Sequence, residues 1–210
     1  MIIVKNANPS PRPRGRPRGF DCDAALAVAM ETFWRLGYEG ASIADLTAAM
    51  GITPQSLYAA FGSKAELYRK ALALYRATAG SSVAQALAEA PTVTAAFERI
   101  LLERARLFAH PGHPPGCMIS AAVLTCASEN APVADHLKEL RLGALASFRS
   151  VLERGKQSGE FRVDLDVDGL ARFLCAMIQG MAVQARDGAS EADLVGLAHM
   201  ASEELARWRA

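Results

Sequence analysis

Residues 42–64, SIADLTAAMGITPQSLYAAFGSK, constrain the fold of this chain more than any other stretch. Ser42 can cap a helix whose apolar residues recur at helical spacing, at Ile43, Leu46 and Met50. Gly51 suits the left-handed residue that ends a helix. Thr53 can cap a second helix, with Pro54 at its first position. Two such short helices cannot hold a core of their own, so they must extend from a larger body as a helix-turn-helix.

The rest of the composition predicts an all-α protein. The chain has 210 residues, of which 51% are hydrophobic and 21% charged, and no stretch alternates apolar and polar residues long enough to indicate a strand. We expect about nine helices, in an N-terminal three-helix helix-turn-helix domain at residues 20–66 and a larger helical unit at residues 67–210.

Apolar spacing and breaker residues place the individual helices. The expected ranges are 21–36, 43–50, from 54 onward, 63–79, 92–109, 117–128, 133–158, 167–186 and from 190 to the C-terminus. The 117–128 segment is almost uncharged, so we expect it to be deeply buried. The last two helices form a hairpin, and a hairpin paired with its symmetry mate makes the four-helix bundle of a homodimer.

Charge is distributed unevenly along the chain, although the formal net charge is only +1. Residues 1–80 hold ten Lys/Arg against six Asp/Glu, and residues 81–210 hold thirteen against sixteen. The asymmetry favours a basic end that faces nucleic acid. Simple scatter of surface charge is the alternative interpretation.

Residues 1–19 are rich in Pro, Arg and Gly and are expected to form a flexible basic arm. Arg12, Arg14, Arg16 and Arg18 alternate with Pro or Gly, which keeps such a segment extended. Arms of this kind can lie along the DNA backbone or minor groove. The competing interpretation is a solubilising tail.

The N-terminal third of the chain resembles the TetR family of bacterial transcriptional regulators. The matching segments are GRPR at 15–18, FWRLGYEGASI at 33–43 and LTAAMGITPQSLYAAFGSKAELY at 46–68. The resemblance implies a homodimer whose recognition helices enter successive major grooves of a palindromic double-stranded operator. It also implies that residues 67–210 form a ligand-binding and dimerisation domain, and that a small effector releases a repressor from DNA; a minority of the family activates.

On this basis the DNA-binding residues are expected in the arm and around the two short helices. Ser42 would offer a helix N-terminus and its hydroxyl to a phosphate. Gln55 is the best candidate base reader, because its amide can pair with adenine N6 and N7. The full expected set is Arg14, Arg16, Arg18, Ser42, Thr53, Pro54, Gln55, Ser56, Tyr58 and Lys64.

Two members of that set have alternative interpretations. Tyr58 would place its hydroxyl on a phosphate or pack on a thymine methyl, but it could instead be a packed aromatic residue. Lys64 resembles the phosphate-binding lysine of the family, but it could be an ordinary solvated lysine. Because the second short helix has few long polar side chains, specificity could depend on DNA shape and phosphate register.

The effector is expected to be a small apolar or aromatic molecule. The candidate ligand-binding residues are Tyr75, Phe97, Phe108, Met118, Met177 and Met181, although an apolar stripe at helical spacing is more often plain core. His110 and His113 lack the acids or cysteines of a metal site. Cys117 could sense oxidants, but a buried inert thiol is favoured.

Other classes of protein receive little support from the sequence. The chain lacks HExxH and GxSxG motifs and CxxC pairs, so no catalytic, metal or cofactor site is expected. VDLDVDG at 163–169 is better explained as a loop and helix N-terminus than as a calcium loop. No stretch is long and apolar enough to enter a membrane, so we expect a cytoplasmic, nucleoid-associated protein. The remaining alternatives are an all-helical small-molecule-binding protein, an enzyme or a protein-interaction module that does not bind DNA.

Deletion of residues 1–18 should weaken binding to the operator and flatten the dependence of affinity on salt, because fewer counterions would be released. Fluorescence anisotropy titrations over a range of salt concentrations measure both effects. An unchanged salt slope would reject the arm as a DNA contact.

Overall fold

The computed structural model describes residues 20–120 and 122–210, and the regular structure in these ranges is helical. This confirms the all-α prediction. The helices are α1 (Cys22–Gly40), α2 (Ile43–Met50), α3 (Pro54–Phe61), α4 (Lys64–Ala77), α5 (Ser82–Glu89), α6 (Val93–Ala109), α7 (Ala131–Gln157), α8 (Val167–Arg186) and α9 (Glu191–Ala206), with a 3₁₀ turn at Ser128–Asn130.

Local sequence signals fix the ends of the N-terminal helices. Asp21 caps α1 by accepting hydrogen bonds from the backbone N–H groups of Asp23 and Ala24. Gly37 interrupts the helical geometry inside α1 with φ of 74°, and Gly51 ends α2 in the left-handed region with φ of 65°. These turns fold α2 against α1, and α3 packs in turn against α2 and α4.

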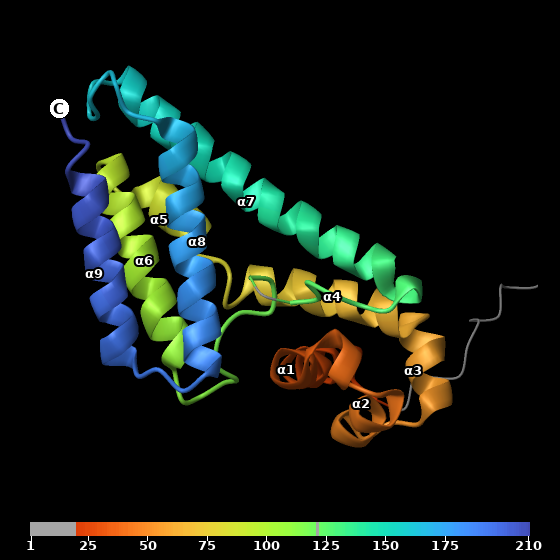
Figure 1. Ribbon diagram of the computed structural model, residues 1–210. Helices are drawn as coiled ribbons and strands as arrows, with labels where there is room; N and C mark the ends of the chain where they lie inside the picture. The colour runs from red at the N-terminus through yellow and green to blue at the C-terminus, as the bar shows by residue number, and fades with distance from the viewer. Residues whose placement is uncertain (1–19, 121) are drawn as a thin grey trace, which may run out of the picture.

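The larger body is built around α6. Helix α6 packs extensively against α9 and also contacts α5 and α8. Figure 1 shows α6, α8 and α9 standing side by side, while α7 extends diagonally from the upper end of α8, above α4, toward the end of the molecule that holds α3. The centre of this body is apolar, with Phe97, Ile100, Leu101, Leu152, Leu174 and Leu194 fully buried.

Helix α4 joins the two units, as Figure 1 shows. Near its start, Tyr68 packs edge-on against Phe33 of α1 with ring centroids 4.8 Å apart. Two turns later, Tyr75 packs edge-on against Trp34 of α1, with ring centroids 4.9 Å apart. All four rings are buried, so α4 is held against α1 at two points along its length.

The structure corrects one predicted helix. Within 117–128 the described residues form turns, only Cys117 and Met118 are buried, and Leu124 is 67% exposed. Val123 has φ of 48°, and the guanidinium of Arg141 binds the carbonyls of Ile119 and Ala122, so the backbone groups are paired outside a helix. Apolar composition without a capping residue therefore led to the wrong prediction.

Two further differences concern the end of α4. Helix α4 stops at Ala77, where the expected helix continued to residue 79. Helix α5 at Ser82–Glu89 was not predicted, although Val83, Ala86 and Leu87 have the spacing of a short amphipathic helix. The turn between α4 and α5 lines a large cavity through Gly80 and Ser81.

Glu160 ties three helix ends together. Its carboxylate accepts hydrogen bonds from the backbone N–H groups of Val93 and Thr94 at 2.8 and 2.7 Å and from the Thr94 hydroxyl, at the start of α6. Its own carbonyl, after the end of α7, accepts from the N–H of Ala210, after the end of α9. Burial opposes ionisation of Glu160, but the hydrogen bonds from Thr94 and Val93 outweigh it and lower its pKa.

Replacing Glu160 by Gln should lower the free energy of unfolding by about 1 kcal/mol at pH 7, because charge-assisted capping bonds are lost. A lowered pKa in the folded state means that this stabilisation exists above the unfolded-state pKa and disappears as pH falls through the folded-state value. The difference between the two proteins should therefore shrink below about pH 4. Urea unfolding followed by circular dichroism tests this, with Glu98→Gln on the exposed side of α6 as control; a difference independent of pH would contradict it.

Candidate DNA-binding interface and ligand cavity

Helices α2 and α3 form the helix-turn-helix that the sequence indicated. Leu46 and Leu57 are fully buried and Phe61 is 5% exposed, so these residues attach the pair to the rest of the unit. Thr53 caps α3 by accepting from the backbone N–H of Ser56, and Pro54 occupies its first turn.

The outer face of α3 presents a small set of side chains to solvent. Gln55, Tyr58 and Ala59 lie three and four residues apart and are exposed, with Tyr58 at 49%. The hydroxyls of Thr53 and Ser56 lie 3.0 Å apart and hydrogen-bond to each other. Gln55 and Tyr58 therefore carry the uncommitted polar groups on the first turns of α3.

Ser42 differs from the expectation in what its hydroxyl does. The hydroxyl donates to Asp45 Oδ2 at 2.6 Å, and the Asp45 backbone N–H donates back to Ser42 Oγ, which completes a capping box. Hydrogen bonds from Ser42 lower the pKa of Asp45, so a carboxylate occupies the N-terminus of α2. A phosphate approaching this end would meet the remaining backbone N–H groups beside a negative charge.

Lys64 is partly buried, and its ammonium group contacts an aromatic ring. Its Nζ lies 4.6 Å from the centre of the Tyr38 ring, and burial lowers its pKa while Glu39 opposes that shift. The ammonium thus packs the start of α4 against α1 while remaining at the same end of the molecule as α3. Arg14, Arg16 and Arg18 lie outside the described residues.

A hollow of about 300 Å³ lies beside the first turn of α3. Its lining includes Phe20, Ile52, Thr53 and Ser56. Phe20 is the first described residue after the expected arm.

A second contact region joins α1 to the body. The indole N–H of Trp34 donates to the carbonyl of Gly116 at 3.2 Å, and its ring stacks on His113 at 4.5 Å. His110 stacks in turn on His113 at 5.1 Å. The 110–116 loop is therefore packed onto α1 through Trp34, which also touches Tyr75 of α4.

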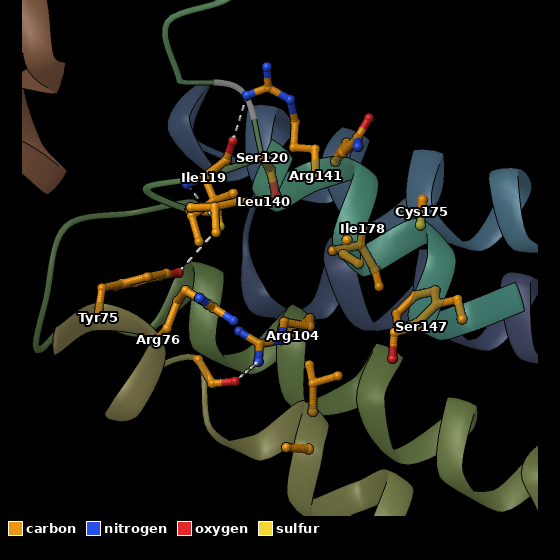
Figure 2. A pocket seen from close by; sticks show the side chains of 18 of the residues that line it. Tyr75, Arg76, Arg104, Ile119, Ser120, Leu140, Arg141, Ser147, Cys175 and Ile178 are labelled. Carbon is orange, nitrogen blue, oxygen red and sulfur yellow. Dashed lines mark hydrogen bonds between the residues drawn. The ribbon is translucent and has the colours of Figure 1, made fainter. Parts of the chain in front are cut away.

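The body contains a cavity of about 720 Å³ between α4, α5, α6, α7 and α8. This volume suits a small organic molecule. Figure 2 shows Tyr75, Arg76 and Arg104 on one side and Leu140, Arg141 and Ser147 of α7 on another. Ala84 and Ala144 line the cavity and are exposed, so it opens to solvent between α5 and α7.

Cys117 lies in the cavity wall in a polar setting. The Tyr75 hydroxyl donates to its Sγ at 3.4 Å, and the backbone N–H of Ile119 donates to the same sulfur at 3.4 Å. Burial, followed by the influence of Cys117, raises the pKa of Tyr75, so its hydroxyl stays protonated. Burial also raises the pKa of Cys175, in the same lining, to about 11 despite the opposing effect of Arg172.

The structure distributes the expected ligand-binding residues over four places. Tyr75 and Phe108 line the cavity. Phe97 lies behind it, edge-on to the lining residue Phe148 at 4.9 Å. Met118 and Met181 are buried in the core, and Met177 lines a separate groove between α8 and α9.

Several lining residues were not anticipated from the sequence. They are mainly Arg76, Val83, Leu87, Arg104, Ile119, Leu140, Arg141, Ser147, Cys175 and Ile178. Val83 and Leu87 belong to the unpredicted α5, whose spacing was the available signal. The arginines gave no such signal, because an arginine on an amphipathic helix is normally solvent-exposed.

The described residues were also considered as a metal site and as membrane-spanning helices. No group of three or more His, Cys, Asp or Glu residues there is arranged to hold a metal ion. None of the helices described has both the length and the apolar character required to cross a bilayer.

Two segments of the chain match known protein families. "Bacterial regulatory proteins, tetR family" covers residues 25–71, and "Tetracyclin repressor-like, C-terminal domain" covers residues 95–194. The first match contains the helix-turn-helix, and the second contains most of the helical body.

Individual relatives extend the similarity over nearly the whole chain. The HTH-type transcriptional repressor ComR of Escherichia coli (strain K12) is 36% identical over 87% of this chain and 87% of its own length. The repressor BdcR from the same organism is 29% identical over 92% and 93%. The solved structure of a cysteine mutant of the TetR family transcriptional regulator CifR, complexed with 26 bp double-strand operator DNA, is 40% identical, with a TM-score of 0.86 over 90% of this chain and 98% of that chain. This protein therefore belongs to the TetR family of bacterial transcriptional regulators.

Proposed function

We propose that the protein is a transcriptional repressor that binds a palindromic operator as a homodimer and is released by a small effector. The observation that carries the DNA-binding part is the exposed polar face of α3, where Gln55 and Tyr58 point away from the buried Leu57 and Phe61. A helix held in this way can enter the major groove and place its first turns against base edges. ComR and BdcR are transcriptional repressors, and the structure of CifR is a complex with operator DNA, which supports the same role.

We assign different parts of the interface to different tasks. Gln55 reads a base edge, and Tyr58 contacts a phosphate or a thymine methyl. The N-terminus of α2 and Lys64 set the register on the backbone, with Lys64 held in place by Tyr38. Phe20 lies beside Thr53 and Ser56, so an arm that continues from Phe20 starts next to the base-reading turn.

The dimer is proposed to form through α8 and α9. An apolar groove between these helices is lined by Phe173, Met177, Leu197, Met200 and Trp208, and Met200 is 67% exposed. Apolar surface of this kind marks an interface, and pairing of the two hairpins would bury it in a four-helix bundle. The twofold axis would then present two copies of α3 to half-sites about 34 Å apart or a multiple of that distance.

Effector control follows from the position of α4. An effector acts only if it binds the DNA-competent and DNA-incompetent states with different affinities. The C-terminal half of α4 lines the cavity through Tyr75, while its N-terminal half packs on α1 through Tyr68. A tilt of α4 would change the separation of the two recognition helices.

Selection of bound fragments from the genome of the source organism, followed by footprinting, should enrich a short inverted repeat. Gln55→Ala should then weaken binding to that repeat by about 1–3 kcal/mol and relax specificity at one base position in each half-site. Gln85→Ala, at an exposed glutamine of α5, is the matched control and should bind normally. Absence of any enriched repeat would favour a helical small-molecule-binding protein or enzyme without DNA binding.

Met200→Lys should shift the protein from dimer to monomer, because a lysine at the centre of the proposed interface cannot be buried without a partner. Sedimentation equilibrium measures the shift. Leu36→Lys, at an exposed position of α1, is the control and should remain dimeric. A dimer constant unchanged by Met200→Lys would exclude this face as the interface.

A further inference from the structure

Arg104 of α6 is a buried charged residue beside the cavity. Only 6% of the surface of this residue is exposed to solvent. The guanidinium donates to the carbonyls of Ala79 and Gly80 at 3.3 and 3.0 Å and to the Ser82 hydroxyl at 3.1 Å. All three acceptors are neutral, and no carboxylate in the described part of the chain forms an ion pair with Arg104.

This arrangement leaves Arg104 without an ionised partner in the described part of the chain. A guanidinium has five N–H donors, and the three hydrogen bonds above occupy only part of that capacity. Burial of a cation is unfavourable unless an anion or several good acceptors replace the lost water. These carbonyls follow the C-terminal end of α4 and supply hydrogen bonds and partial negative charge, but no full counter-charge.

The surroundings of Arg104 add positive charge. Arg76 of α4 lines the same cavity and is exposed, and no ion pair involves it in the described ranges. Figure 2 shows Arg76 and Arg104 on the same side of the cavity. Arg141 lies on the opposite side and is held by the carbonyls of Ile119 and Ala122. The acid in the lining, Glu139, has a side chain that is 78% exposed and faces His136, so it does not neutralise this region.

The remaining lining is largely apolar. Helix α5 supplies Val83 and Leu87, α6 supplies Phe108, and α7 and α8 supply Leu140, Phe148 and Ile178. The cavity therefore has a cationic side at the end of α4 and an apolar interior between α5, α7 and α8. Such a site fits a ligand with one charged end and an apolar body.

We propose that the effector is an amphipathic organic anion, whose carboxylate, sulfonate or phosphate group binds Arg104 and Arg76 while its apolar body lies between α5 and α7. The assignment rests on the proposed function, because it specifies the ligand class of the proposed effector cavity. Relative to the small apolar or aromatic molecule expected from the sequence, it adds an anionic group.

The position of Arg104 gives this class of ligand a direct route to the DNA-binding unit. Two of the acceptors that Arg104 holds, Ala79 and Gly80, lie in the turn after α4, and the third, Ser82, is the first residue of α5. An anion bound to the guanidinium competes with those acceptors, since an ionised acceptor makes the stronger hydrogen bond. Binding therefore loosens or shifts the turn at the C-terminal end of α4.

Two fluorescent probes of nearly the same shape test the assignment on the full-length protein. 8-Anilinonaphthalene-1-sulfonate carries a sulfonate, and N-phenyl-1-naphthylamine has the same aromatic body without it. The anionic probe should bind at least about tenfold more tightly than the neutral one. Arg104→Gln should abolish this preference while leaving the affinity for the neutral probe unchanged. Arg106→Gln, which removes the same charge from an exposed position of α6, should leave both affinities unchanged.

A second pair of variants makes the result independent of how well Arg104→Gln folds. Arg76→Gln changes an exposed residue and should also weaken binding of the anionic probe selectively. Ala144→Trp should block both probes by filling the cavity, which shows that they bind there. Equal affinities for the two probes, unaffected by Arg104→Gln and Arg76→Gln, would overturn the anionic assignment and leave the effector cavity standing. Failure of Ala144→Trp to reduce binding of either probe would overturn the cavity as the effector site and the assignment with it.

Discussion

The aromatic packing between α1 and α4 is the interaction on which the arrangement of the whole molecule depends. Tyr68 on Phe33 and Tyr75 on Trp34 fix α4 to α1 at two points along its length. A helix held at two points moves as a rigid rod with its partner. The proposed DNA-reading face and the cavity are thereby parts of one mechanical unit, although they are lined by different segments of the chain.

The features that could be predicted from the sequence are those set by neighbouring residues. Gly51 at the end of α2 and Thr53 at the start of α3 need only their local backbone, so their roles follow from residue type. The segment 117–128 could not be predicted in this way, because its carbonyls are bound by Arg141, a side chain on the following helix α7. Apolar composition indicated burial and a helix there, and tertiary contacts decided otherwise.

The residues of the candidate sites also divide into those placed by local sequence and those placed by tertiary contacts. The position of Gln55 on the first turn of α3 follows from the capping pattern around it. The packing of Lys64 on Tyr38 and the burial of Arg104 depend on contacts between separate helices, and no local spacing indicates them. The Ser42 hydroxyl is bound to Asp45 in a capping box, whose residue pattern is present in the sequence. Polar residues with a tertiary partner are thus the ones that sequence reasoning places least well.

The junction at Glu160 has a consequence for how the body can deform. It joins the start of α6 to the ends of α7 and α9, so that this extremity acts as a fixed pivot. Rotation about a pivot produces the largest displacement at the far end of the lever arm. For α6 that far end is Ala109, from which the 110–116 loop continues to Trp34. Any small angular change of α6 about this junction would therefore be largest where the body meets the helix-turn-helix unit, at the contact of Gly116 with Trp34.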